Sequence, residues 1–285
     1  MSVSMLKEQY RRCCQILINA MLRHGGFNVL ICIISLNLIT SCASNISEAN
    51  LANARIHYDI GVSNLERGDF RGALSELLIA VDLNPEMPQT HNALGLVYHA
   101  LEKSKEALEH YERALELKPD FSQAHNNFGI LLIDLGRYDE AIEHFKKALN
   151  DILYNTPSLA EGNMGWAYYK NGEVDKGRIH LRNAIAQSPK FCRGYLWLAQ
   201  IGIDIGDSAD VIVNARRFDK HCLNNENNQN SREAEYIREM HYYQGLAYLK
   251  QDDRQAARQS FASCATTESN SKFGVKCTQS LRSVE

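Results

Sequence analysis

Cys42 is the residue whose surroundings point most directly to a chemical reaction. It follows an apolar run, Phe27–Ile39, that ends in Ile39-Thr40-Ser41-Cys42. The run is too short to span a bilayer and has a basic residue, Arg23, on its N-terminal side, as secretory signals do. The last four residues resemble a bacterial lipobox, in which the cysteine is acylated and becomes the first residue of the mature protein. We therefore expect a signal peptide at residues 1–41 and a lipid on Cys42.

The lipid would hold the remaining chain at a membrane, with residues 42–53 as a short tether. Met21 is a second candidate for the start of the chain, because Met21-Leu22-Arg23-His24 would place a compact basic segment before the apolar run. The alternative is that Phe27–Ile39 is an ordinary buried segment or a signal anchor, and that Cys42 carries no lipid.

Four further cysteines remain beyond Cys42, and they could form disulfides. They are Cys192, Cys222, Cys264 and Cys277. An even number of cysteines in an oxidising compartment favours two disulfides, and four cysteines allow three pairings.

Other residue types that carry catalysis or bind metals show no such pattern. We find no Gly-rich phosphate loop, no nucleophile elbow, and no histidine pair at i, i+4 with a catalytic glutamate. His57, His91, His125 and His241 take equivalent positions in different repeats, so successive ones are about 10 Å or more apart and too far from each other to share one metal ion. We expect them to be packing residues, and we expect no enzymatic activity, metal, cofactor or small-molecule substrate.

The charge balance argues against nucleic acid as a partner. The chain has 31 basic and 34 acidic residues, a net charge of −3. Residues 1–41 contain four basic residues and one acidic residue, so their removal leaves 27 and 33, a net charge of −6. Nucleic-acid binding needs clustered basic surface that replaces counterions. The apolar content of 45% is ordinary for a folded protein.

A repeat fills the chain beyond the tether. A small residue recurs with spacings of 34, 34, 36, 34 and 46, at Gly61, Gly95, Gly129, Gly165, Ala199 and Gly245. A period of 34 is typical of tetratricopeptide repeats, each of which is one helix hairpin. The sequence therefore predicts an all-α fold, a right-handed superhelical solenoid of about six hairpins with a C-terminal capping helix.

The predicted repeats occupy residues 54–270, and the capping helix and tail occupy residues 272–285. Individual repeats are expected at about 54–87, 88–121, 122–157, 158–191, 192–225 and 238–271. All five prolines lie near the junctions between repeats, where a helix must stop. Gly68, Gly136, Gly172 and Gly206 share one position between the two helices of a hairpin, which suits a left-handed residue, and repeat two has Glu102 there.

The hairpins also bear on the cysteine pairing. Cys192 begins the first helix of repeat five and Cys222 ends its second helix, so an antiparallel hairpin brings them together. Cys264 lies in repeat six and Cys277 in the capping helix expected to stack over it. This placement favours Cys192–Cys222 and Cys264–Cys277, with a buried free thiol at Cys264 as the alternative.

Stacked hairpins would offer a concave groove lined by the first helix of each repeat. Several positions expected to face it are apolar, and an apolar groove suits an amphipathic or hydrophobic segment of another protein. The alternative for any one of these residues is packing against the next helix. The expected groove residues are Leu96, Ile130, Ile133, Trp166, Tyr169, Leu196, Ile203 and Tyr242.

Several stretches resemble the Tgl/PilF family of type IV pilus lipoproteins. They are Ala148-Leu149-Asn150-Asp151 with Tyr154 and Pro157, Gly162–Tyr169, and Pro189-Lys190-Phe191-Cys192 with Gly194-Tyr195. The two-residue insertion before Pro157 is part of the likeness, which covers nearly all of the chain after Cys42. The Asn-rich segment 224–230 departs from it.

This resemblance implies an outer-membrane lipoprotein on the periplasmic side that acts as a pilotin. Such a protein binds secretin subunits of the type IV pilus machine and promotes their targeting and multimer assembly. The alternative is a general periplasmic scaffold lipoprotein for cell-envelope complexes.

Overall fold

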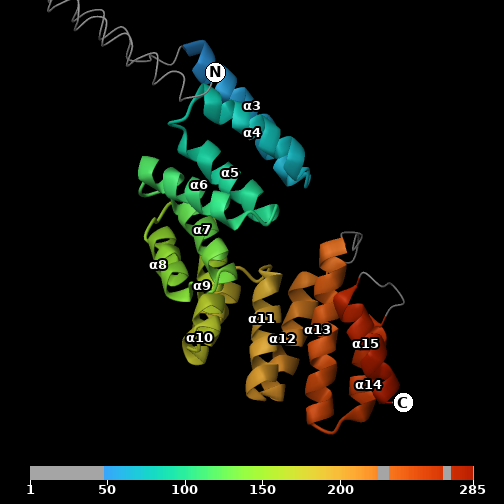
Figure 1. The fold of residues 1–285 in the computed structure, drawn as a ribbon. Coiled ribbons are helices and arrows are strands. Elements are labelled where there is room, and N and C mark those ends of the chain that lie inside the picture. Colours follow the sequence, from blue (N-terminus) through green and yellow to red (C-terminus); the bar gives the residue numbers. More distant parts are fainter. Residues whose placement is uncertain (1–47, 224–230, 266–270, 285) are drawn as a thin grey trace, which may run out of the picture. The chain divides into compact units, whose positions relative to one another are not determined.

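The computed structural model describes residues 48–223, 231–265 and 271–284. Every regular element in these ranges is an α-helix, as Figure 1 shows. The chain divides into two units, Met1–Leu51 and Ala52–Glu285, and nearly all described residues belong to the second. Cys42 and the predicted signal peptide, residues 1–41, lie outside the described part.

The helices of the described ranges fall into pairs. They are α3 (Glu48–Glu66), α4 (Phe70–Leu83), α5 (Pro88–Ala100), α6 (Ser104–Leu117), α7 (Ser122–Asp134), α8 (Tyr138–Leu149), α9 (Pro157–Lys170), α10 (Val174–Gln187), α11 (Cys192–Ile205), α12 (Ser208–Cys222), α13 (Ser231–Lys250), α14 (Arg254–Cys264) and α15 (Lys272–Ser283). Odd-numbered helices from α3 to α13 are the first helices of six hairpins, and even-numbered helices are the second helices.

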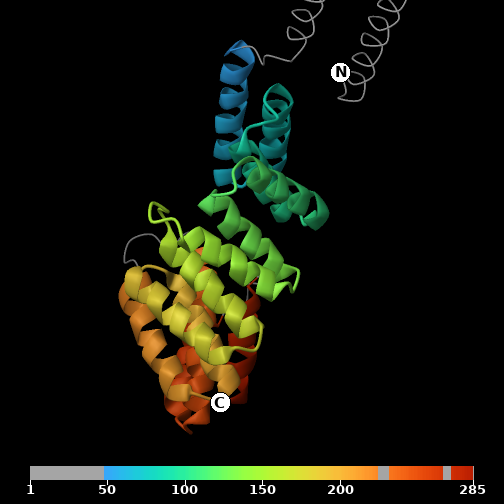
Figure 2. The same cartoon turned by 90° about the vertical axis from the view of Figure 1, so that its left-hand side faces the viewer.

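Within Ala52–Glu285 the hairpins stack in chain order (Figures 1 and 2). From α4 onward, each second helix packs against the first helix of the next hairpin, and from α5 onward successive first helices also touch. Helix α15 packs on α13 and α14, as the first helix of a further repeat would. The predicted all-α solenoid of about six hairpins with a capping helix is confirmed.

The repeating glycine explains how closely the two helices of a hairpin approach. A Cβ atom on Gly95 would lie 2.6 Å from the ring of Tyr111, and one on Gly129 would lie 2.6 Å from the ring of Phe145. Both rings are fully buried between hairpins. Since burying one such side chain contributes about 1.5–3 kcal/mol, the small residue and the large ring stabilise each hairpin together.

The turns between paired helices follow the predicted pattern. Gly68, Gly136, Gly172 and Gly206 all have positive φ angles, between 74° and 87°. Glu102 takes the same left-handed conformation in repeat two, with φ of 59°. The glycine positions predicted from the sequence are confirmed.

Two helices begin earlier than the sequence predicts. Residues 48–53, expected to belong to the tether, are the first turns of α3, and Ala and Leu in this stretch favour a helix. Helix α13 begins at Ser231, seven residues before the expected start of repeat six at 238. The added segment, Ser231–Ile237, contains Glu, Ala and Arg and no proline, so nothing in it ends a helix.

Candidate protein-binding face

The first helices share one face, which begins with a chain of side-chain amides. Asn163 donates to Asn126 over 3.1 Å, and Asn127 donates to Asn92 over 3.1 Å. Asn126 and Asn127 are linked at 3.4 Å, so the chain of amides crosses α5, α7 and α9. Because each inward amide has a partner, this part of the face is polar and internally satisfied.

The amide chain stops at Gly162, which stands where repeats two and three have Asn92 and Asn126. A Cβ atom on Gly162 would lie 2.2 Å from the ring of Phe191. The space left by the missing side chain therefore holds the Phe191 ring, and Trp197 packs edge-on against that ring with a centroid separation of 6.0 Å.

Stacked aromatic rings replace amides in the next part of the face. The indoles of Trp166 on α9 and Trp197 on α11 are nearly parallel, with centroids 5.1 Å apart and an interplanar angle of 9°. Tyr169 lies against Trp166 at 5.1 Å. Arg193 lies over Trp197 and over Tyr236, 5.6 Å from each ring, and donates to the Tyr236 hydroxyl over 2.7 Å. The stack thus joins α9, α11 and α13 on one face.

Tyr169 also links two first helices by a hydrogen bond. Its hydroxyl donates to a carboxylate oxygen of Asp204 on α11. Partial burial and this bond raise the pKa of Tyr169 to about 12, so the phenol stays protonated and keeps donating at neutral pH. The bond fixes the ring beside Trp166.

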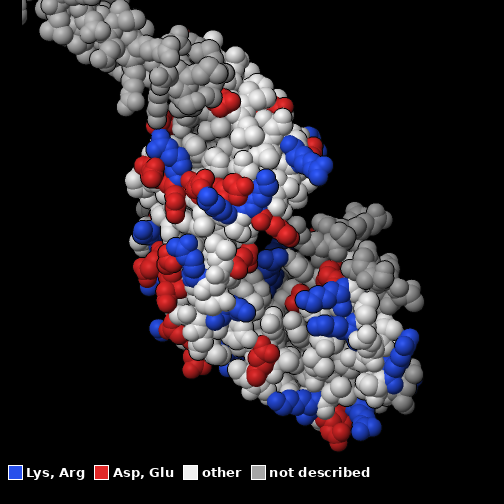
Figure 3. Space-filling model, in the orientation of Figure 1, with Lys and Arg blue, Asp and Glu red and all other residues white. Residues whose placement is uncertain are grey.

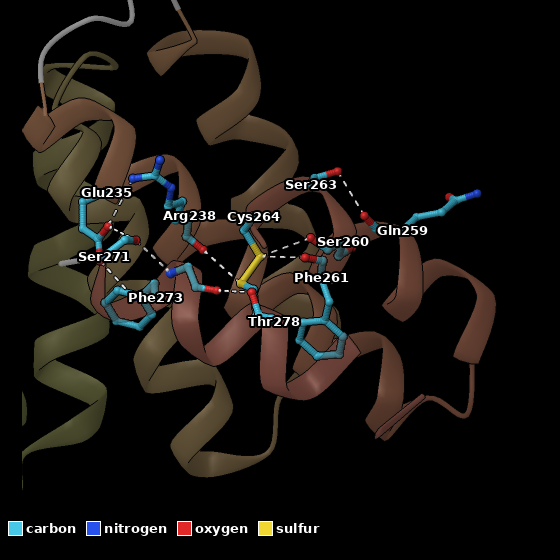
Figure 4. Close-up of a disulfide and its surroundings, with 12 residues drawn as sticks. Glu235, Arg238, Gln259, Ser260, Phe261, Ser263, Cys264, Ser271, Phe273 and Thr278 are labelled. Carbon is cyan, nitrogen blue, oxygen red and sulfur yellow. Dashed lines mark hydrogen bonds and ion pairs between the residues drawn. A yellow bond between two sulfur atoms is a disulfide. The ribbon is translucent and has the colours of Figure 1, made fainter. Parts of the chain in front are cut away.

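The C-terminal end of the face is built from α13 and α15. The rings of Tyr242 and Phe273 are 5.7 Å apart, and Lys276 lies 5.2 Å from the first ring and 5.1 Å from the second. Figure 4 shows how α15 is held: Glu235 accepts from the Ser271 hydroxyl at 2.7 Å and from the Phe273 backbone N–H at 2.9 Å. Burial opposes the ionised Glu235, but these hydrogen bonds outweigh it and lower the pKa of Glu235.

Both disulfides of the structure lie in this C-terminal half. Cys192 is bonded to Cys222, and Cys264 is bonded to Cys277 (Figure 4). These are the two pairs that the hairpin arrangement favours. The first joins the ends of α11 and α12, and the second fastens α15 to α14.

Most of the expected groove residues are half-buried on the first-helix face. Leu96, Ile130, Ile133, Tyr169, Ile203 and Tyr242 each expose part of the side chain and pack the rest against the core. The prediction for Leu196 is wrong, because its side chain is only 2% exposed and belongs to the core. Helix α11 touches α9, α10, α12 and α13, so more of its positions are apolar than those that face the groove.

The sequence did not single out Trp197, Arg193 or Tyr236. Its sequence position could have placed Trp197 on the first-helix face. It is the sixth residue of its repeat, where repeats three and four have Asn127 and Asn163. Tyr236 gave no such signal, because it lies before the expected start of repeat six. It reaches Arg193 only because α13 begins early.

Two histidines pair across the second hairpin, and two pair across the third. Nδ1 of His91 faces Nδ1 of His110 at 3.1 Å, and Nδ1 of His125 faces Nδ1 of His144 at 2.9 Å. A cleft of about 400 Å³ beside the second pair is lined by α6, α7 and α8.

In the part of the chain that the structure describes, no three metal-ligating side chains come together, and no helix is both long and apolar enough to cross a bilayer. On the face drawn in Figure 3, acidic and basic side chains are interspersed.

Comparison with known proteins agrees with the repeats. Models of the tetratricopeptide repeat match residues 86–151 and 239–271. Among curated proteins, the photosystem I assembly protein Ycf3 of Synechococcus elongatus is 36% identical over 66 residues, which are 23% of this chain. The chain spans only 38% of the length of that relative.

Several solved structures share the fold. PilW, described as a widely conserved type IV pilus biogenesis factor, superposes with a TM-score of 0.68 at 22% identity, over 79% of this chain and 98% of PilW. The pilF protein of Pseudomonas aeruginosa gives 0.63 at 18% identity, over 82% of this chain and all of its own. A tetratricopeptide repeat protein of Parabacteroides merdae gives 0.59 at 16% identity, over 81% and 84%. Its paired helices and the matching repeat models show that the chain contains tetratricopeptide repeats within an all-α solenoid.

Proposed function

We propose that this protein is an outer-membrane lipoprotein that binds type IV pilus secretin subunits on its first-helix face and promotes their assembly into multimers. The fold likeness to PilW, a type IV pilus biogenesis factor, supports a role in pilus biogenesis. The sequence resemblance to pilus lipoproteins and the lipobox-like Ile39-Thr40-Ser41-Cys42 support the lipid anchor.

The observation that carries the binding role is the stacked pair Trp166 and Trp197. Both indoles remain partly exposed although they are packed against each other. Aromatic side chains held in this way lose little conformational entropy on binding, and they dominate the energetics of many interfaces. A partner segment that covered both rings would bury a large apolar area at small cost.

The lipid would convert this binding into assembly. Each buried methylene of an acyl chain contributes about 0.8 kcal/mol, so a multiply acylated Cys42 would stay in the membrane. A secretin subunit held on the first-helix face would then be confined to the same surface as other subunits. Confinement raises their effective concentration for oligomerisation, and no chemical step is required.

The proposal is tested by measuring secretin multimers on semi-denaturing gels in a deletion strain complemented with variants. We expect Cys42→Ala to lose multimers because the protein is mislocalised. Trp166→Ala should lose them with the protein still in the outer membrane, because binding is weakened. Tyr138→Ala, on the second helix α8, is the matched aromatic control and should leave multimers intact. Normal multimers with Trp166→Ala would contradict the proposed binding face, and altered cell-wall turnover with normal pili would favour a general scaffold.

A further inference from the structure

Four cations lie over aromatic rings on the first helices of the C-terminal half and on α15. We call the rings and cations together the aromatic–cation strip. Besides Arg193 and Lys276, Lys170 lies 5.9 Å from the Trp166 ring and Lys272 lies 5.5 Å from the Phe273 ring. The strip consists of Trp166, Lys170, Arg193, Trp197, Tyr236, Tyr242, Lys272, Phe273 and Lys276.

None of the four cations forms an ion pair with the described carboxylates, whereas several basic residues elsewhere do. Five basic residues on or beside the second helices each bind a carboxylate within 3.1 Å: Arg113, Arg137, Lys146, Lys176 and Arg178. Lys170, Arg193 and Lys272 are exposed, so their charges are open to a ligand.

Three carboxylates near the strip have partners of their own. Glu235 accepts from Ser271 and Phe273, and Asp204 accepts from Tyr169. Glu239 accepts from the Tyr243 hydroxyl at 3.2 Å, and burial raises the pKa of Glu239 although Lys272 and Arg193 act against that shift. These three acids are therefore engaged within the fold. Phe273 is buried, but the cations and the other rings of the strip are at least partly exposed.

We infer that the strip recognises an amphipathic segment of a partner protein whose polar residues are carboxylates. Apolar side chains of such a segment would cover the exposed parts of the rings. Its carboxylates would meet cations that the rings already hold in place, so little side-chain entropy is lost on pairing. This inference rests on the proposed function, because it names the chemistry of the segment that the first-helix face would bind.

The net charge of the whole chain makes the inference easy to test. A net charge of −3 would by itself attract a basic peptide, so a preference for an acidic one must come from a local surface. The chain contains only two tryptophans, Trp166 and Trp197, and both belong to the strip. Tryptophan fluorescence therefore reports directly on its occupancy.

The experiment uses two synthetic amphipathic helices of about five turns with the same apolar positions, one with Glu and one with Lys at the polar positions. Each is titrated into the purified chain and followed by tryptophan fluorescence. We expect the acidic peptide to bind about tenfold more tightly at low salt and to lose this advantage as salt rises. Lys170→Glu combined with Lys276→Glu should abolish the preference. Lys105→Glu, an exposed lysine on the second helix α6, is the matched control and should leave it unchanged.

Equal binding of the two peptides, tighter binding of the basic peptide, binding of neither, or an unchanged preference in the double lysine variant would each overturn the inference. Circular dichroism of the double variant separates a lost preference from a lost fold. The secretin-multimer gel separates this inference from the proposed function. If Trp166→Ala abolishes multimers while the acidic preference is absent, the proposed function stands and the partner chemistry is wrong.

Discussion

Two histidine pairs join a first helix to a second helix through facing Nδ1 atoms. His91 Nε2 lies 3.0 Å from the Pro85 carbonyl oxygen, and His125 Nε2 lies 3.0 Å from that of Pro119. A carbonyl can only accept, so Nε2 carries the proton in each case and Nδ1 is left as an acceptor. The partner ring must then donate from its own Nδ1. At neutral pH both rings of a pair are neutral, because burial lowers the pKa of all four histidines.

The pairs predict a loss of stability on acidification. Burial, followed by the charge of the facing histidine, lowers the pKa of His110 and of His144 to about 4. Since these values lie below the unfolded value of about 6.5, the folded state is fully favoured above that pH and loses free energy as the pH falls toward 4. Because the rings are partly exposed and screened, we expect a loss of about 1 kcal/mol per pair.

Urea unfolding across this pH range measures the effect. The double variant His110→Gln and His144→Gln keeps an N–H donor for each partner ring but cannot gain a charge at these positions. Its free energy of unfolding should fall less steeply between about pH 6.5 and 4. Identical slopes for the variant and the original chain would show that the histidine pairs do not cause the pH dependence.

The sequence correctly predicted His91 and His125 as packing residues but did not reveal their partners. His91 and His110 are 19 residues apart, as are His125 and His144, so the spacing was visible. The same spacing joins His57 to Glu76. A pairing between nitrogens depends on which one carries a proton, and the Pro85 and Pro119 carbonyls that decide this are known only from the fold.

Each turn inside a hairpin depends on one left-handed residue. Repeat three has Gly136 there, with no atom within 4 Å of a Cβ built on it, and repeat two has Glu102 in the same conformation. Any effect of substitution at Gly136 must therefore come from the backbone conformation, since no neighbour would be displaced.

Substitutions at these two positions should change stability in opposite directions. We expect Gly136→Ala to lower the free energy of unfolding by about 1 kcal/mol, because a Cβ disfavours positive φ. Glu102→Gly should raise it by up to about 1 kcal/mol, reduced by the extra entropy of glycine in the unfolded chain. Denaturant unfolding of both variants measures this, and a stabilising Gly136→Ala would contradict the turn geometry.

The capping helix α15 depends on one covalent bond and one carboxylate. Its disulfide, Cys264–Cys277, closes a loop with a sequence separation of 13, and Glu235 binds its first turn. The chain-entropy model gives about 3 kcal/mol for a disulfide that closes a loop of this size.

Removing that disulfide should loosen α15 before the rest of the fold. In the double variant Cys264→Ser and Cys277→Ser, we expect amide exchange in α15 to accelerate and overall stability to fall by up to about 3 kcal/mol. Cys192→Ser with Cys222→Ser is the matched control, because it removes a disulfide from α11 and α12 and should leave exchange in α15 unchanged. Equal acceleration of α15 in both double variants would rule out a local role for Cys264–Cys277.

At the scale of elements, the sequence was most informative where the repeat is strict. The glycines at a period of 34, and the turn residue Gly136 with its equivalents, predicted hairpins that the structure confirms. The prediction was poorer where no repeat constrains the boundary. Helix α13 begins at Ser231 because local propensity and contact with α11 extend it beyond the repeat.

At the scale of the whole molecule, the sequence identified the first-helix face only in part. The helical period correctly placed Trp166 and Tyr169 on it but put Leu196 there as well, because a stripe of apolar residues looks the same whether it faces a neighbour or solvent. The stack of Trp197 on Trp166 depends on Phe191 filling the space beside Gly162. Such a contact between repeats four and five is not encoded by either repeat alone.

The proposed lipid anchor leads to a prediction about distance. Only residues 43–47 separate Cys42 from the first residue of α3, so an extended chain would keep the start of the first helix within about 20 Å of Cys42. If confinement beside the membrane drives secretin assembly, a longer tether should weaken it without changing any contact. Inserting a flexible Gly/Ser segment of about 30 residues after Asn45 should lower the effective concentration of bound secretin subunits at the membrane roughly tenfold. This concentration falls with about the −3/2 power of linker length.

Secretin multimers at limiting secretin expression measure this effect. The same segment added after Glu285 is the matched control and should leave multimer yield unchanged. Fractionation must find both proteins in the outer membrane, so that a lower yield reflects distance and not mislocalisation. If the chain with the long tether assembles multimers as well as the original, assembly does not depend on confinement near the membrane. Binding at the first-helix face alone would then have to account for it.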